Sequence, residues 1–238
     1  MPKMMVGAFA AETRIALAGI AAEGGDERAA ALQLIDLIDL KGCIVTADAL
    51  HCHADMAERV GGRGGDYALR LKANQPGLLK GAKAALDGAG VRMARQEGRR
   101  HGLAEARTAS VAPAGALAAA TGFPRLQAVA RIIHEREGKE SEERFYLLSR
   151  RFTPERLMAV ARQHWSIENN LHWTLDTVFC EDAARSRKDN APQNLATMRR
   201  LALNIARMHP DKKTPMRRKL MRAAWNEDFF FDLIRHMR

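Results

Sequence analysis

Short apolar runs separated by polar turns fill the first third of the chain and predict alternating strands and helices. Two such runs, at residues 4–10 and 14–18, predict a strand, a turn and a second strand. Apolar residues at helical spacing follow over residues 27–40, where Lys41 and Gly42 are expected to end the helix. The chain is therefore expected to open with a hairpin and one helix.

The next apolar runs predict a βαβ unit. Residues 43–47 are nearly all apolar, as in a strand buried on both faces of a parallel sheet, and Asp48 follows at the carboxyl end. A helix over 54–60, a glycine-rich loop and a strand over 67–72 complete the unit. Because ligands bind at the carboxyl ends of strands in open α/β sheets, Asp48 is a candidate site residue.

The spacing of apolar residues is less regular between residues 87 and 125, and we interpret this segment as an insertion or linker of uncertain structure. Two strands are predicted after it, at 126–134 and 144–149, joined by a polar turn. A long helix then begins at Thr153-Pro154, a typical N-cap followed by proline at the first helical position.

This long helix has a carboxylate on its apolar stripe. Glu168 falls at the centre of a stripe formed by Leu157, Ala161, Trp165, Leu171, Leu175 and Phe179. Burial of an ionised carboxylate is costly unless a cation or hydrogen bonds compensate it. One hypothesis is a divalent metal ion shared with Asp48, because hard cations select oxygen ligands. The alternative is a buried pair of Glu168 with Arg162 or Arg185, with Asp48 capping the next helix.

The charge is concentrated in one segment. The chain has 38 Lys and Arg against 28 Asp and Glu, a net charge of +10, and residues 183–222 alone hold 12 basic and two acidic residues. Such a patch is typical of a protein that binds a polyanion, although a solvated basic tail has the same composition.

The remaining composition excludes several classes of protein. With 47% hydrophobic and 28% charged residues, the 238-residue chain is typical of a folded soluble protein rather than a fibrous or disordered one. No apolar run approaches the roughly 20 residues of a membrane span, and no signal peptide is predicted. The three cysteines lack disulfide or zinc-ribbon spacing. We expect a cytoplasmic protein with reduced thiols and no membrane partner.

Several blocks resemble one family across nearly the whole chain. These are HWSIENNLHW at 164–173, NAPQNL at 190–195, LKGCIVTADA at 40–49, GDYAL at 65–69 and LKANQP at 71–76. Together they strongly resemble the H-repeat-associated insertion-sequence transposases of the DDE type.

The resemblance implies an RNase H-like α/β fold, a mixed sheet with flanking helices and a β-rich insertion before the last catalytic helix. It implies that Asp48 and Glu168 are the second and third of three catalytic, metal-binding carboxylates. In the family these carboxylates hold two Mg²⁺ or Mn²⁺ ions for cleavage and strand transfer of double-stranded DNA, generally by a homo-oligomer. The residues expected to contact DNA are Lys72, Asn74, Asn169, Arg185, Arg187 and Lys188.

The sequence departs from the family at its first carboxylate. Family members carry that aspartate in an Asp-Gly-Lys strand upstream of the segment matching residues 4–12, and the 238 residues contain no match to it. We therefore expect a DDE domain over 4–206 without its first strand, an insertion at about 87–150 and a basic helical tail over 207–238. The expected function is that of an amino-terminally truncated, catalytically incomplete transposase. The alternatives are a DNA-binding remnant that associates with full-length transposase and a generic metal nuclease.

Overall fold

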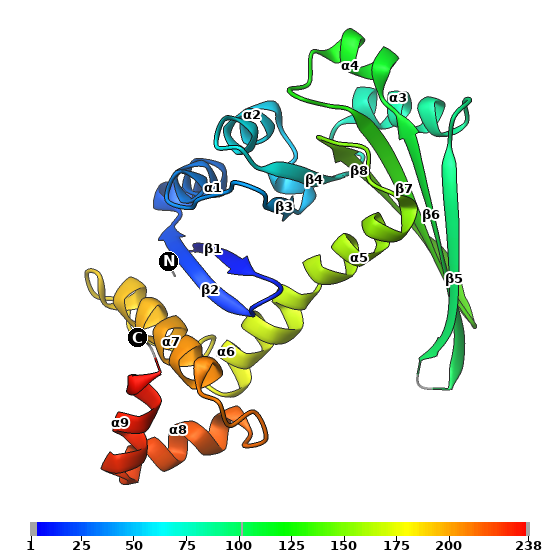
Figure 1. The fold of residues 1–238 in the computed structure, drawn as a ribbon. Helices are drawn as coiled ribbons and strands as arrows, with labels where there is room; N and C mark the ends of the chain where they lie inside the picture. Colours follow the sequence, from blue (N-terminus) through cyan, green and yellow to red (C-terminus); the bar gives the residue numbers. More distant parts are fainter. Residues whose placement is uncertain (1–3, 101, 237–238) are drawn as a thin grey trace. The chain divides into compact units, whose positions relative to one another are not determined.

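The computed structural model describes residues 4–100 and 102–236, without the side chain of Arg100. The chain forms two compact units. Ile35–His164 make the first, which we call the sheet unit. Met1–Leu34 and Trp165–Arg238 make the second, the helical unit, and Figure 1 labels the elements of both.

The sheet unit is built on six strands in the order β3-β4-β8-β7-β6-β5. Their bounds are β3 Ile44–Ala47, β4 Asp66–Leu71, β5 Arg92–Arg100, β6 Leu103–Pro113, β7 Ala128–Arg136 and β8 Lys139–Leu148. Strands β3 and β4 are parallel and are connected through α2 (Ala54–Gly62), whereas every other pair is antiparallel. The predicted βαβ unit is thus confirmed.

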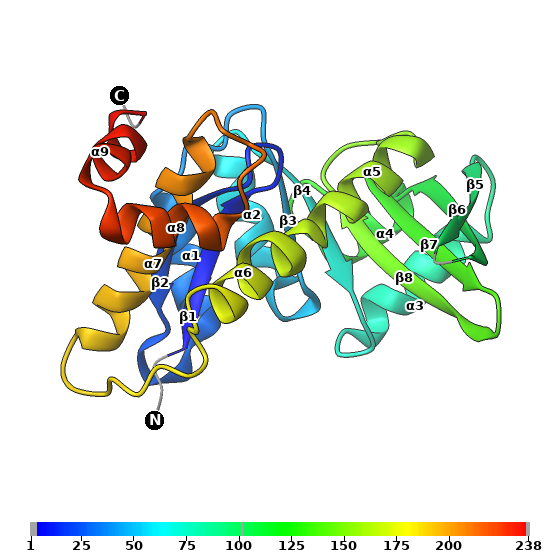
Figure 2. The same cartoon turned by 90° about the horizontal axis from the view of Figure 1, so that it is seen from below.

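Helices cover both faces of this sheet. Figures 1 and 2 show α3 (Pro76–Leu86), with α4 (Gly115–Thr121) beside it, on one face and α5 (Pro154–His164) on the other. The apolar face of α5 packs on alternate residues of the strands, the arrangement that a period of two produces. This core includes Ala128, Ala130, Ile132, Tyr146, Leu148, Leu157, Met158 and Val160. Thr153 caps α5 as predicted, since its Oγ1 accepts from the Arg156 amide at 3.2 Å.

The interpretation of residues 87–125 as a linker is wrong, because this segment contributes two paired strands to the sheet, whereas its interpretation as an insertion stays a prediction. Strands β5 and β6 form a regular hairpin, and β7 extends the sheet beside β6. Arg95 on β5 donates to Thr108 on β6 at 3.2 Å and pairs with Glu135 on β7 at 2.6 Å, so exposed polar contacts link the three strands. The apolar alternation that predicts strands is missing because β5, at the edge of the sheet, has no buried residue among its described side chains.

Two further predictions in the first third need correction. Helix α1 (Glu27–Asp36) ends before Leu40, and Gly42 instead adopts a positive φ of 76° in the turn before β3. Strand β3 is only half-buried, because it lies at the other edge of the sheet and pairs with β4 alone among the described strands.

The helical unit begins with the predicted hairpin, β1 (Met5–Ala10) against β2 (Ile15–Ala21). After a short 3₁₀ turn at Glu23–Gly25 come α1 and, much later in the sequence, a π-helix at Glu168–His172 and α6 (Trp173–Thr177). The unit ends with α7 (Ala191–Met208), α8 (Met216–Trp225) and α9 (Glu227–Arg235). Its core is formed by Ala16, Leu171, Leu175 and Leu203, with Phe9, Ile167, Phe179 and Met216 packed around them.

Polar side chains join the hairpin to α7 and close the end of that helix. The Asn204 side chain accepts from the Ala16 amide at 3.0 Å and donates to the Ala16 carbonyl at 2.8 Å. At the carboxyl end of α7, Lys219 is buried and donates to the Ala206 carbonyl, and Lys212 donates to the Arg207 carbonyl. These ammonium groups satisfy free carbonyls at the negative end of the helix dipole.

Within residues 4–100 and 102–236, no helix combines the length and apolar character needed to cross a bilayer. Cys43, Cys52 and Cys180 are all free thiols, as predicted. The division of the chain into a domain over 4–206 and a tail over 207–238 stays a prediction.

We expect Asn204→Ala to lower the free energy of unfolding by about 1–3 kcal/mol, because it leaves two partly buried backbone groups of Ala16 without partners. Urea denaturation measures the effect. Asn194→Ala is the control, because Asn194 is exposed on the same helix and its replacement by alanine changes the helix propensity by the same amount. Equal stability of the two variants would contradict the bridging role of Asn204.

Candidate active site

Asp48 lies where β3 ends and a 3₁₀ turn over Ala49–His51 begins. Although Asp48 occupies the N-cap position of this turn, its side chain makes no capping hydrogen bond and is 60% exposed. The alternative in which the Asp48 side chain caps the following helix is therefore wrong. At this exposure the carboxylate is accessible to a ligand.

Two basic side chains flank the Asp48 carboxylate. Oδ1 lies 3.7 Å from Nη1 of Arg70 on β4 and 3.6 Å from Nε2 of His164 at the end of α5. The other ring nitrogen of His164 lies 3.1 Å from Oγ1 of Thr46, within hydrogen-bond distance. Arg70 also approaches Glu142, at 3.7 Å. Because Arg70 and His164 are mostly buried, they restrict where the carboxylate can point.

The loop after β4 supports the loop that follows Asp48. The Asn74 side chain donates to the Ala49 carbonyl at 3.4 Å, and the Gln75 side chain donates to the Cys52 carbonyl. Both bonds join the carboxyl ends of the two parallel strands. The backbone around Asp48 is thus held from the neighbouring strand as well as by its own turn.

Glu168 begins the π-helix of the helical unit. Its side chain is 55% exposed, and Oε2 lies 3.3 Å from Nδ1 of His172, one turn further on. The prediction that Glu168 is buried is therefore wrong, as is the buried pair with Arg162 or Arg185. Arg162 instead donates to Gln96, and Arg185 is exposed.

The π-helix explains why Glu168 is exposed. A π-helix has i→i+5 bonding, so each turn takes about one residue more than in an α-helix. Leu171 and Leu175 remain in the core, whereas Glu168 is turned away from the stripe that α-helical spacing places it on. Trp165, another member of the predicted stripe, is exposed as well.

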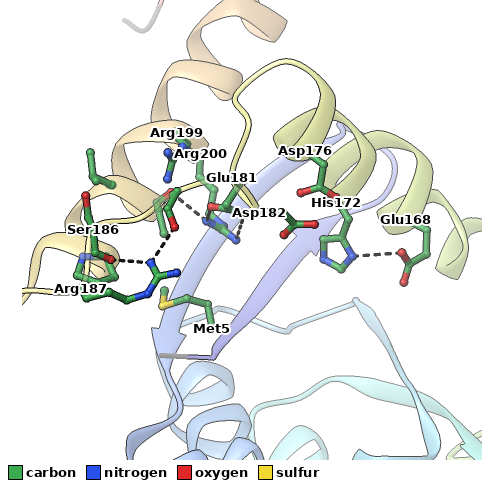
Figure 3. A pocket seen from close by; sticks show the side chains of 14 residues that line it. Met5, Glu168, His172, Asp176, Glu181, Asp182, Ser186, Arg187, Arg199 and Arg200 are labelled. Atoms are coloured by element: carbon green, nitrogen blue, oxygen red, sulfur yellow. Dashed lines mark hydrogen bonds and ion pairs between the residues drawn. The ribbon is translucent and has the colours of Figure 1, made fainter. Parts of the chain in front are cut away.

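Glu168 lines a cleft within the helical unit (Figure 3). The acidic side chains on one side belong to the π-helix, to α6 and to the loop that follows α6. The basic side chains on the other side belong to the same loop and to α7. The charged residues of the lining are Glu168, His172, Asp176, Glu181, Asp182, Arg187, Arg199 and Arg200.

Ion pairing neutralises only part of this cleft. Arg200 binds Glu181 through both terminal nitrogens, at 2.8 and 3.3 Å. Arg187 bends back and donates to the carbonyls of Ala184 and Ser186, at 2.7 and 2.8 Å. Carbonyl contacts leave the charge of Arg187 uncompensated, so an anion can still bind beside it.

The carboxylates of the acidic side interact with one another. Partial burial raises the pKa of Asp176, and the nearby charges of Asp182 and Glu181 raise it further, against the lowering effect of His172. A hydrogen bond with Asp182 also favours the protonated form of Asp176. Mutual repulsion of this kind is relieved when a cation binds or when two carboxylates share a proton.

Residues 5–205 match the protein family described as "Transposase DDE domain". The chain belongs to this family. Among proteins of Escherichia coli K12, it is 28% identical to "Putative protein YbfL", over 85% of this chain and 57% of that protein. It is also 28% identical to "H repeat-associated putative transposase YhhI", over 89% and 60%, respectively.

A third relative, "Putative transposase YncI" of Escherichia coli O157:H7, is 29% identical over 97% of this chain and 63% of its own length. The chain therefore spans about three fifths of the length of these relatives. No solved structure matches it. The resemblance read from the sequence motifs is confirmed. The predicted fold class is confirmed too, because a mixed six-stranded sheet with flanking helices is consistent with an RNase H-like DDE transposase fold.

The two carboxylates assigned from the transposase family lie in different units of the chain. Asp48 belongs to the sheet unit and Glu168 to the helical unit, and the surroundings of each are described above. Their convergence on shared metal ions stays a prediction. The catalytic and metal-binding assignments rest on the family motifs and on the availability of both carboxylates.

The six residues expected to contact DNA fall into two groups. Lys72, Arg185 and Lys188 are exposed, with no side-chain contact described. Three others bond within the chain, namely Asn74 to Ala49, Asn169 to the Trp165 carbonyl at 3.3 Å, and Arg187 to the loop carbonyls. A DNA contact for any of them stays a prediction.

Sequence reasoning assigned no role to Arg70 or Gln75, although Gln75 lies within a family-like block and Arg70 lies between two of them. His164 and His172 stand four residues on either side of Glu168, a spacing that places one helical turn between each pair. From this spacing a hydrogen-bonded histidine or a supporting role beside Glu168 is expected, and His172 does contact Glu168. No pattern in the sequence indicates that His164 reaches Asp48 on a distant strand.

We expect Asp182→Asn to lower the pKa of Asp176 toward the ordinary 3.8, because it removes a like charge. NMR titration of the side-chain carboxyls measures this shift. Since a raised folded-state pKa means that the native protein binds more protons, the parent loses stability as pH rises from 3.8 through the raised value. The variant should lose less over that window.

Asp189→Asn is the matched control. Asp189 is exposed in the loop after Asp182, and an asparagine is compatible with its φ of 50°. The substitution Asp189→Asn removes one negative charge, as Asp182→Asn does, but at a position that does not line the cleft. The pKa of Asp176 should therefore not change. If Asp182→Asn leaves the pKa of Asp176 where it was, the two carboxylates do not interact as described.

Proposed function

We propose that this chain acts in metal-dependent cleavage and strand transfer of DNA as part of an insertion-sequence transposase. The observation that carries the proposal is the match to the DDE family over residues 5–205, combined with two available carboxylates at the family's motif positions. The chain contributes the second and third carboxylates and basic residues for phosphate binding. The homo-oligomer on paired DNA ends is proposed by resemblance alone.

The donor atoms fit Mg²⁺ or Mn²⁺. Asp48 offers a carboxylate that caps no helix, and Glu168 offers one beside two further carboxylates, Asp176 and Asp182. Oxygen donors of this kind are the ligands that hard divalent cations select, usually with several waters retained. When bound, such ions activate the attacking oxygen and stabilise the leaving oxygen of an in-line displacement at phosphorus.

The residues around each carboxylate have separate tasks. Arg70 and His164 hold the Asp48 carboxylate from two sides, at distances longer than a hydrogen bond. They orient it without occupying its lone pairs. His172 lies within hydrogen-bond distance of the Glu168 carboxylate, one turn away, and orients it. Residues that orient a ligand in this way affect both metal affinity and activity in metalloenzymes.

The basic residues suit the phosphate backbone rather than base edges. Arg185 and Lys188 are exposed, and Arg187 is fixed on the loop by its carbonyl contacts. Cations on a loop next to the Glu168 cleft bring phosphates close to the carboxylates, which positions DNA and does not specify its sequence. We expect weak sequence preference for this contact.

The test of activity is a cleavage assay on the ends of the element with Mg²⁺ or Mn²⁺. We expect a polypeptide of these 238 residues to show no strand transfer, because it supplies two of the family's three carboxylates. A form extended by the family's Asp-Gly-Lys segment should cleave. Glu168→Gln in that form should lower the rate by at least about 100-fold, the cost of losing a group that stabilises the transition state.

Glu58→Gln, an exposed position on α2, is the control and should leave the rate unchanged. Cleavage by the 238-residue polypeptide that Glu168→Gln abolishes would mean that another residue supplies the third carboxylate. If the extended form binds DNA and does not cleave it, the chain has the non-catalytic binding role instead.

We further expect steep salt dependence of binding to duplex DNA. The double variant Arg185→Gln with Lys188→Gln should reduce the slope of log K against log salt by about 2, close to one unit for each lost phosphate contact. Fluorescence anisotropy over a salt series measures it. The control is Lys139→Gln with Arg156→Gln, which removes equal charge from exposed positions of the sheet unit. A slope near zero for the parent would refute DNA binding.

A further inference from the structure

Three side chains with metal-ligating atoms meet near the end of the chain, beyond the residues that match the transposase family. His209 directly follows α7, and Asp232 and His236 lie four residues apart on α9 and its C-cap. Nε2 of His209 is 3.0 Å from Oδ2 of Asp232, and Nε2 of His236 is 3.5 Å from Oδ1 of the same carboxylate.

These distances suit ligands of one tetrahedral ion. Zn–N bonds of about 2.0–2.1 Å and Zn–O bonds of about 2.0–2.2 Å place neighbouring tetrahedral ligand atoms about 3.3 Å apart. All three ligand atoms lie within 4.8 Å of one another, so a small side-chain adjustment brings them around one centre. Two imidazoles and one carboxylate are a donor set typical of zinc.

The surroundings of the three side chains suit a metal site. The Asp232 carboxylate lies between the two imidazoles, with one oxygen toward each of them. The His209 side chain is only 6% exposed and packs edge-to-face on Phe229, at 5.5 Å between ring centroids. Asp232 and His236 are partly exposed, which provides an entry path and room for a water molecule as fourth ligand.

We infer that His209, Asp232 and His236 form a zinc site that clamps α9 onto the end of α7. The site shares no residue with the proposed Asp48 and Glu168 metal ligands and does not depend on transposase chemistry. A bound ion stabilises the folded tail because the unfolded chain does not hold the three ligands together.

One contact competes with the ion. The backbone amide of Asp211 donates to Nδ1 of His209 at 3.2 Å. A neutral imidazole that binds metal through Nε2 carries its proton on Nδ1, so this hydrogen bond must break when zinc binds. Without metal, Nδ1 accepts the hydrogen bond from the Asp211 amide and therefore carries no proton. The proton of the neutral ring then lies on Nε2, from which His209 donates to Asp232. Zinc binding is therefore expected to reduce the protection of the Asp211 backbone amide against hydrogen exchange.

The experiment is calorimetric titration of the chelator-treated 238-residue chain with ZnCl2. We expect one site with a rise in Tm on loading. Asp232→Asn and His236→Gln should each weaken zinc binding by at least about 10- to 100-fold. Loss of a residue that only hydrogen-bonds to a metal ligand already costs about that much affinity, and these two residues are the ligands themselves. Asp228→Asn is the matched control, because it removes the same charge from an exposed position on α9. It should bind zinc like the parent.

Two further measurements exclude other sites. The double variant Asp48→Asn with Glu168→Gln should retain the site, and the Asp211 amide should exchange faster with solvent in the zinc-loaded chain. The proposal is overturned if the parent binds no zinc at micromolar concentration, or if Asp232→Asn and His236→Gln bind as the parent does. An Asp211 amide that stays protected at saturating zinc also overturns it, because His209 would then not be a ligand.

Discussion

The packing of Leu171 and Leu175 against Leu203 and Ala16 decides which way Glu168 faces. In this core, Leu171 and Leu175 come from the π-helix and α6, Ala16 from the hairpin and Leu203 from α7. A regular α-helix that kept both leucines inside would also place Glu168 near the core. The π-helix lets the leucines stay buried while the carboxylate reaches the cleft. Single π-turns inside helices are often found at functional sites, and here the irregular turn starts at the proposed metal ligand.

Several basic side chains of the positively charged segment form hydrogen bonds or ion pairs with other groups of the same chain. Arg200 compensates Glu181, Arg207 donates to the Arg14 carbonyl at 2.5 Å, and Lys212 and Lys219 close the end of α7. These four residues belong to the segment that holds the whole net charge. The net charge of a segment therefore overstates the cations free to meet phosphate. What distinguishes Arg185 and Lys188 is their exposure beside the cleft rather than their membership of a basic run.

The sequence predicts the fold well where burial imposes a regular period. The βαβ unit around Asp48, the first hairpin and the start of α5 follow from apolar spacing and capping residues. The β5–β6 hairpin could not be predicted in this way, since charged pairs such as Arg95 with Glu135 replace apolar alternation at a sheet edge. For the site, the position of Asp48 follows from the strand that precedes it. The exposure of Glu168 does not, because counting by α-helical spacing assumes a geometry that the π-helix breaks.

The side chain of Asn204 has a consequence for the edge of the hairpin. An unpaired edge strand presents free amides and carbonyls that another strand can add to, which is a route to aggregation. At Ala16, both groups are already bonded to the Asn204 amide, in the manner of a neighbouring strand. A foreign strand that approached β2 at this point would have to displace both bonds. Asn204 therefore works as edge protection, and α7 guards the first hairpin against unwanted strand addition.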